Sequence, residues 1–332
     1  MMRTRFGRFI LSSPNPIPMP VGVYTGLEIT GASVKDAVTS SQAQSEAVLA
    51  MHERLHTQIL QTVMDLSAEA ETFGCQIRMS DDEIPTVIGR RVTSEQDIQH
   101  LVQPSVGDGR TAVHLQAAHN LVAHADGCPV LGETIGPFSL AARLLGVSEA
   151  LELSLTDPDM VHQLLLRVTR FLTDYVLAFR AEGASGVIMA EPAAGLLSPR
   201  ALSQFSSAYI KTIVEATQTE DFTLILHNCG ARLVHLPKIL EAGAEVFHFG
   251  APMDIGEALQ KVDDDIILAG NLDPTSVFHN GTVAEVTAQT EALMQLSAGR
   301  KNFIPSSGCD LAPHTPIQNL EAFFSTVRAG AE

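Results

Sequence analysis

The stretch FTLILHNCG, residues 222–230, carries both the fold pattern and the first sign of function. Its first half is a continuous apolar run, which is typical of a strand buried on both faces of a parallel sheet. The run ends in His227 and Cys229, two side chains that bind metals well, followed by a glycine. Residues i and i+2 of a strand point to the same side, so both side chains can face one point.

Similar apolar runs recur along the chain, with helix-like segments such as 157–182 between them. This alternation predicts parallel strands, and eight runs predict a closed (β/α)₈ barrel, the TIM barrel. The runs at 85–89 and 128–136 allow other assignments. A doubly wound open sheet is the alternative, but no G-x-G-x-x-G motif follows the first run. The eight runs are 62–67, 85–89, 128–136, 185–192, 222–230, 244–250, 265–274 and 302–309.

Composition excludes several classes of protein. The 332 residues are 45% hydrophobic, enough for a large core, and we expect an N-terminal arm at 1–20 and one barrel domain at 21–332. The formal net charge of −17 argues against nucleic-acid binding. No apolar run is long enough to span a membrane. Four widely spread cysteines suggest a reducing cytoplasm rather than a disulfide framework.

The chemistry of a barrel gathers where its strands end, and Cys309 lies at the end of the last run. Closure of the barrel can bring Cys309 to His227 and Cys229. One imidazole and two thiolates suit Zn²⁺, and three protein ligands leave a fourth position for water or substrate. We interpret the three residues as zinc ligands, with ordinary buried side chains as the alternative.

Several motifs, taken in order, resemble the uroporphyrinogen decarboxylase superfamily over nearly the whole chain. They are TGLEITGASVKDAV, MDLSAEAETFGCQI, EPAAGLLSPRAL, LHNCG, LAGNLDP and SSGCDLAPHTPIQNL. The decarboxylases of this superfamily use no metal, begin with an Arg-rich motif and have a Gly-His-Gly near the end. The branch similar to methylcobalamin:coenzyme M methyltransferases instead carries His-x-Cys and a later Gly-Cys as zinc ligands.

The chain departs from the decarboxylases in both places. The N-terminal RTRFGRFILSSPNP lacks the Arg-rich motif, and Cys309 in SSGCD stands where those enzymes have histidine. Binding a substrate with many carboxylates without clustered arginines is physically hard. The methyltransferase branch is therefore favoured over two alternatives, a decarboxylase-type lyase and a non-catalytic corrinoid- or tetrapyrrole-binding protein.

The resemblance implies a mechanism and its partners. Zn²⁺ on His227, Cys229 and Cys309 would deprotonate a small thiol, which would attack the methyl group of a methyl-corrinoid such as methylcobalamin. A separate carrier protein would present the corrinoid. Where coenzyme M enzymes have an acidic residue, after the strand at 244–250, this chain reads Gly250-Ala251-Pro252. The acceptor therefore stays open between coenzyme M, another thiol and a folate-type carrier.

Other polar residues at strand ends complete the expected site. Asp65 stands where the decarboxylases have an essential aspartate, so we assign it a catalytic role. Glu191 is assigned as a second catalytic group that orients the His227 ring. Asn271 and Asp273 in GNLDP are assigned to cofactor binding, with a strand-to-helix turn as the alternative.

Two further expectations concern the metal and the assembly. His248, Glu191 and water are the candidates for a fourth zinc ligand. The segment 157–182 is apolar around most of its circumference. Such a helix is buried on more than one side, either within the barrel or in a homodimer.

Overall fold

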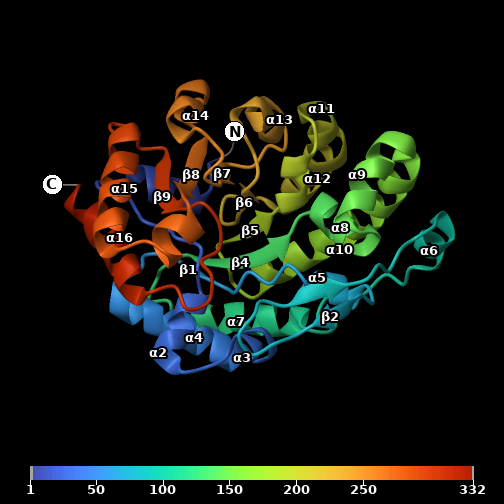
Figure 1. Cartoon of the computed structure of the whole chain (residues 1–332), viewed down its shortest axis with the longest axis horizontal. Helices are drawn as coiled ribbons and strands as arrows, with labels where there is room; N and C mark the ends of the chain where they lie inside the picture. The colour runs from blue at the N-terminus through green and yellow to red at the C-terminus, as the bar shows by residue number, and fades with distance from the viewer. Residues whose placement is uncertain (1–2, 331–332) are drawn as a thin grey trace.

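Seven parallel strands form one curled sheet in the order β1–β4–β5–β6–β7–β8–β9. The computed structural model describes residues 3–330. Figure 1 shows these strands in the middle of the molecule with helices around them. The single α/β domain with a parallel sheet is as predicted. The strands are β1 (Leu60–Gln61), β4 (Val130–Ile135), β5 (Gly186–Ala190), β6 (Thr223–Asn228), β7 (Val246–Phe249), β8 (Ile267–Leu272) and β9 (Phe303–Ser307).

Helices cover the outer face of the sheet and connect its strands (Figure 1). The longer ones are α1 (Arg5–Ser12), α4 (Ser41–Leu55), α7 (Thr111–His124), α8 (Pro137–Leu145), α9 (Val147–Thr156), α10 (Pro158–Ala181), α12 (Ala208–Thr217), α14 (Ile255–Lys261), α15 (Val283–Leu296) and α16 (Ile317–Ala329). The shorter ones are α2 (Leu27–Thr30), α3 (Val34–Thr39), α5 (Ala68–Thr72), α6 (Glu95–His100), α11 (Pro199–Leu202) and α13 (Leu236–Leu240). Single turns are η1 (Tyr24–Gly26), η2 (Pro192–Leu196), η3 (Ser203–Ser207), η4 (Leu233–His235) and η5 (Pro274–His279).

The prediction that residues 85–89 form a strand of this sheet was wrong. Residues Thr86–Ile88 form β3, which pairs antiparallel with β2 (Gln76–Arg78) in a separate hairpin. Ile88 is 51% exposed, and the other side chains of β3 are not buried either. A short β-branched run therefore looked like a core strand, although the hairpin does not bury it.

The N-terminal segment 17–21 runs along the free edge of β9. The Met19 N–H donates to the Pro305 carbonyl at 2.9 Å. The Val21 N–H donates to the Ser307 hydroxyl at 2.9 Å. The segment thus packs against the sheet, and the boundary that we placed at residue 20 stays a prediction.

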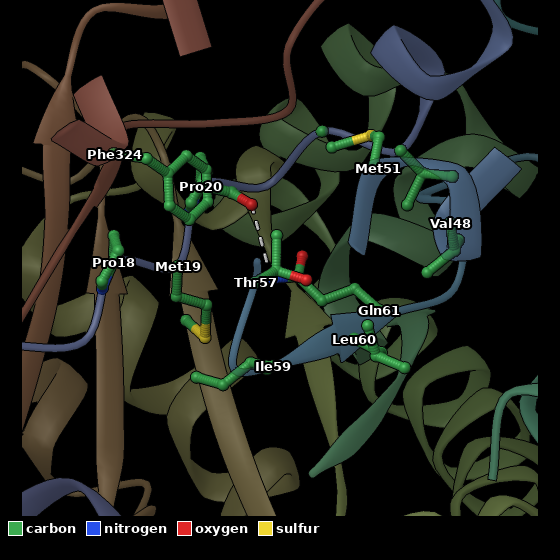
Figure 2. A pocket seen from close by; sticks show the side chains of 12 residues that line it. Pro18, Met19, Pro20, Val48, Met51, Thr57, Ile59, Leu60, Gln61 and Phe324 are labelled. Atoms are coloured by element: carbon green, nitrogen blue, oxygen red, sulfur yellow. Dashed lines mark hydrogen bonds between the residues drawn. The ribbon is translucent and has the colours of Figure 1, made fainter. Parts of the chain in front are cut away.

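The other side of this segment faces β1. Figure 2 shows Pro18, Met19 and Pro20 beside Leu60 and Gln61, around a cavity of about 30 Å³. Contact across this seam includes a hydrogen bond of 3.4 Å from Gln61 Nε2 to the Pro20 carbonyl. Proline has no N–H, so the alternating prolines prevent a regular ladder here.

Side chains alternate between the two faces of the sheet. On β5, Ile188 points to the concave face while Val187 and Met189 belong to the core under the helices. Side chains of α1 pack into the same concave-face cluster. That cluster contains Phe6, Ile10, Ile17, Met19, Val21, Ile59, Met64, Leu131, Ile188, Ala190, Ile225, Val246, Ile267, Ala269 and Ile304.

Packing within the chain accounts for most of the apolar surface of α10. Its side chains Leu165, Phe171 and Phe179 are fully buried in the core under the helices, while Leu166 remains 65% exposed. The broad apolar pattern thus follows from intramolecular contacts, and a homodimer stays a prediction. Among residues 3–330, no helix combines the length and apolar character needed to cross a bilayer.

A buried carboxylate attaches α1 to the sheet. Thr4 caps α1 by accepting from the Gly7 N–H at 3.0 Å, and its hydroxyl donates to Glu245 at 2.5 Å. Thr4 and Glu245 are 0% and 1% exposed. The carboxylate therefore depends on Thr4 for its hydrogen bonds.

We expect Thr4→Ala to lower the free energy of unfolding by about 1–3 kcal/mol, because it removes a helix cap and a partner of a buried carboxylate. Urea denaturation measures the change. Thr156→Ala is the control, since Thr156 is exposed and its hydroxyl bonds only to the Glu152 carbonyl. Equal effects of the two variants would contradict this role of Thr4.

Candidate metal centre

Three potential metal ligands meet at the carboxyl ends of β6 and β9. His227 lies on β6, Cys229 is the first residue after that strand, and Cys309 lies shortly after the end of β9. One ligand atom from each of the three lies within 4.8 Å of the others. The curl of the sheet makes this possible, because β7 and β8 separate the two strands in the sheet order. The structure thus brings together the three residues that the sequence singled out.

Two glycines allow the strand ends to come this close. A Cβ atom on Gly250 would lie 2.2 Å from the Cys229 carbonyl oxygen. A Cβ on Gly308 would lie 2.8 Å from the Ala251 nitrogen. Both contacts are with backbone, which cannot swing away. Any side chain at position 250 would therefore clash with the backbone after β6.

A chain of hydrogen bonds fixes the protons on the His227 ring. Ser306 Oγ donates to the Met19 carbonyl at 2.5 Å, so it accepts from His248 Nε2 at 2.8 Å. The other ring nitrogen of a neutral His248 is then an acceptor. Since His227 Nδ1 lies 2.7 Å from His248 Nδ1, the proton must be on His227. His227 Nε2 is left with its lone pair free.

The free nitrogen is buried and has no hydrogen-bond partner among the described residues. Burial lowers the pKa of His248 well below its ordinary value, which keeps that ring neutral and able to accept. An imidazole held by a second hydrogen-bonding group is the usual arrangement of a metal-binding histidine. The His227 ring is therefore prepared to give one electron pair to a metal ion.

The thiols of Cys229 and Cys309 interact and shift the pKa of each other. The Cys309 thiol lowers the pKa of Cys229 to about 4. The neighbouring Cys229 in turn raises the pKa of Cys309 well above its ordinary value. Cys229 therefore loses its proton more readily than Cys309 does, and metals bind the thiolate form of cysteine.

Glu191 does not orient the His227 ring, contrary to the role we assigned. Its buried carboxylate accepts from the N–H groups of Phe138 and Ser139 at the start of α8, at 2.9 and 2.8 Å. A third bond of 2.9 Å comes from the Ser206 hydroxyl. The carboxylate oxygens of Glu191 thus bind the N-terminus of α8 and the Ser206 hydroxyl. The residue that orients the His227 ring is His248. A catalytic role of Glu191 stays a prediction.

The hydrogen bonds of His248 and Glu191 also limit which group can be the fourth zinc ligand. Both ring nitrogens of His248 are engaged, one with His227 and one with Ser306. Glu191 is occupied as described above. Of the three candidates for the fourth zinc ligand, these contacts favour water.

Asp65 forms a buried ion pair with a residue that the sequence reading overlooked. Arg110 donates to one Asp65 oxygen and, at 2.7 Å, to Glu71. Ser67 donates its hydroxyl to the other Asp65 oxygen at 2.6 Å. The pair ties the segment after β1 to the start of α7. Arg110 is separated from Asp65 by 45 positions in the chain, so no local pattern pointed to it.

Asn271 and Asp273 hold the turns at the end of β8. Asn271 Nδ2 donates to the carbonyls of Gly250 and Met253 at 3.2 and 2.7 Å. Asp273 accepts from the N–H groups of Thr275 and Ser276, at 2.9 and 2.7 Å. These contacts match the turn alternative, and cofactor binding by the two residues stays a prediction.

Comparison with known proteins places this site in a family. The family model described as uroporphyrinogen decarboxylase (URO-D) matches residues 21–330. The chain belongs to the uroporphyrinogen decarboxylase family. The family resemblance read from the sequence motifs is thereby confirmed.

Within this family, the similar relatives include methyltransferases as well as uroporphyrinogen decarboxylases. Methylcobamide:CoM methyltransferase MtbA of Methanosarcina mazei is 30% identical, over 90% of this chain and 88% of its own length. Methylated-thiol–coenzyme M methyltransferase of the same organism is 26% identical, over 90% and 79%. A solved structure of a methyltransferase from Methanosarcina mazei has a TM-score of 0.87 at 22% identity, and covers 99% of this chain and 98% of its own. That last likeness concerns the fold.

We expect His248→Phe to weaken zinc binding by about 10–100-fold, the usual effect of removing a group that orients a metal ligand. The phenyl ring keeps most of the volume but leaves His227 Nδ1 without its acceptor. Competition with a chromophoric chelator measures the affinity. His119→Phe, at an exposed histidine of α7, is the control. Unchanged zinc affinity in His248→Phe would show that the ring does not orient His227.

Gly250→Ala should disturb the metal centre because the added Cβ meets the Cys229 carbonyl. The expected result is at least a tenfold loss of zinc affinity, measured by the same competition, since Cys229 must shift. Gly256→Ala in α14 is the matched control, because its Cβ would come no closer than 3.4 Å to any neighbour. If both variants bind zinc like the wild type, the close approach at Gly250 is not a constraint on the site.

Proposed function

We propose that this protein is a zinc-dependent methyltransferase that moves a methyl group between a methyl-corrinoid and a thiol. The observation that carries the proposal is the convergence of one free imidazole nitrogen and two thiols within 4.8 Å. The imidazole nitrogen is buried without a partner among the described residues, and the Cys309 thiol lowers the pKa of Cys229, which favours a thiolate there. Such a set fits Zn²⁺ better than the oxygen-preferring cations.

His227 Nε2 and the sulfurs of Cys229 and Cys309 would hold the ion. When bound, Zn²⁺ supplies Lewis acidity that lowers the pKa of an incoming thiol and keeps it a thiolate at neutral pH. Three protein ligands leave one position for that thiol. The contacts of His248 and Glu191 keep both side chains away from it.

The transfer is a displacement on the methyl carbon. The substrate thiolate forms the new sulfur–carbon bond, and the carbon–cobalt bond breaks with both electrons remaining on cobalt. Methyl-Co(III) corrinoid becomes Co(I) corrinoid and the thiol becomes a methyl thioether. The protein contributes by fixing the direction from which the thiol approaches. It does so because a series of hydrogen bonds through His248 and Ser306 to the Met19 carbonyl holds the His227 ring in place.

The similar relatives support the corrinoid and the thiol. Both relatives are named as methyltransferases of coenzyme M, and the name of one of them includes methylcobamide. We infer a separate corrinoid carrier protein that docks over the carboxyl ends of the strands. The reaction would take place in the cytoplasm, where the four free cysteines stay reduced.

We also infer that residues 17–21 act as the eighth strand of a closed (β/α)₈ barrel. They occupy the interval between β9 and β1 and bond to both. This closure matters for function, because Met19 in the same segment ends the hydrogen-bond chain to His227.

Metal content and methyl transfer together test the proposal. We expect about one zinc per chain by elemental analysis, and the loss of most of it in Cys229→Ala and Cys309→Ala. Cys128→Ala, at a cysteine just before β4, is the control and should retain zinc. Methylcobalamin demethylation by thiols, followed spectroscopically, should stop in the two ligand variants and after chelation. Full zinc occupancy in both variants would refute the ligand assignment, and thiol-independent release of carbon dioxide from uroporphyrinogen would favour the lyase.

A further inference from the structure

The loops that follow β5 and β6 are joined into one ridge at the carboxyl ends of the strands. We define the ridge as residues 192–200 and 230–235, which include η2 and η4. His235 Nδ1 accepts from the Arg232 N–H at 3.0 Å, so its proton is on Nε2. His235 Nε2 then donates to the Leu197 carbonyl at 3.1 Å. One buried histidine thus ties the two loops together.

The ridge begins directly after a ligand of the metal centre. Gly230 follows Cys229, and its backbone lies against that of Gly195. A Cβ atom on Gly195 would come within 2.9 Å of the Gly230 carbonyl carbon. The two loops therefore meet backbone to backbone, and the ridge is the part of the rim next to Cys229.

The outer surface of the ridge is apolar. Leu196 is 62% exposed and Val234 is 63% exposed, one on each of the two loops. In the described part of the chain, the loops at 250–254 after β7 and 308–316 after β9 have no exposed Val, Leu, Ile, Met or Phe. A ligand that covers both ridge side chains would remove apolar surface from water on this side of the metal centre.

Two arginines flank the apolar pair. Arg200 lies on α11, which contacts η4, and Arg232 lies just before η4. Both are exposed, and neither forms an ion pair within residues 3–330. The chain has a net charge of −17, so acidic partners are abundant elsewhere on it. The guanidinium groups of the ridge can therefore donate to a ligand.

The shape of the methyl donor requires contact with the rim. In a methyl-corrinoid, the methyl group stands on the face of a flat, largely apolar macrocycle whose edge carries carboxamide groups. The substrate thiol can reach the methyl carbon only if this face lies over the metal centre. Because the macrocycle is wide, it must also cover the rim beside Cys229, which is the ridge.

We propose that the ridge seats the corrin ring of the methyl donor. Leu196 and Val234 lie under the macrocycle, and Arg200 and Arg232 donate to carboxamide oxygens at its edge. The inference rests on the proposed function, and it names the surface that binds the donor. Amide oxygens only accept hydrogen bonds, which matches guanidinium groups that only donate. His235 holds the two loops together before the donor binds, so little ordering is needed.

Binding of an unreactive corrinoid tests the ridge without methyl transfer. Cyanocobalamin is the probe, titrated by calorimetry into the zinc-loaded full-length protein. We expect the double variant Leu196→Ser/Val234→Ser to raise its Kd about tenfold, because two apolar contacts are lost. Arg200→Gln/Arg232→Gln should raise the Kd about fivefold, because hydrogen bonds from charged donors are lost.

The matched controls carry the same substitutions away from the ridge. Leu296 is 61% exposed at the end of α15, which leads into the amino end of β9, and Arg170 is exposed on α10. Leu296→Ser and Arg170→Gln should bind cyanocobalamin like the wild type. In the ridge variants the KM for methylcobalamin should rise with the Kd, whereas the zinc content and the KM for the thiol should match the wild type.

The outcomes separate this inference from the proposed function. An unchanged Kd in both ridge variants, an equal rise in the controls, or no binding of cyanocobalamin to the wild type would overturn the ridge as the seat of the corrin ring. Failure of methylcobalamin to methylate any thiol would overturn the proposed function, while the cyanocobalamin titration would still decide whether the ridge binds a corrinoid.

Discussion

The position of one proton on the ring of His227 controls the chemistry of this site. The proton is set by a chain of hydrogen bonds that starts at the Met19 carbonyl and runs through Ser306 and His248. Each member can act in only one direction, because the carbonyl only accepts and the hydroxyl that donates to it must accept from the imidazole. The chain crosses from the N-terminal segment through β9 and β7 to β6. Packing of residues 17–21 along β9 is therefore part of the metal centre, although these residues lie far from it in the sequence.

The glycines at the strand ends define a second constraint on the site. An acidic residue at position 250 would place side-chain atoms against the Cys229 backbone, because even a Cβ there lies 2.2 Å from the carbonyl oxygen. The strand ends are packed too closely for a fourth protein ligand from this position. His248, two residues earlier, serves instead to orient His227.

Much of the fold could be read from the sequence, because apolar runs such as 222–230 and 244–250 are buried on both faces and carry an unambiguous pattern. The assignment failed at 85–89, where a β-branched run of three residues forms a hairpin that stays largely exposed. It also missed residues 17–21, whose prolines hide their strand-like role. The meeting of His227, Cys229 and Cys309 followed from their places at strand ends. The roles of Ser306 and Arg110 did not, since each depends on a partner that is distant in the chain and no local spacing reveals it.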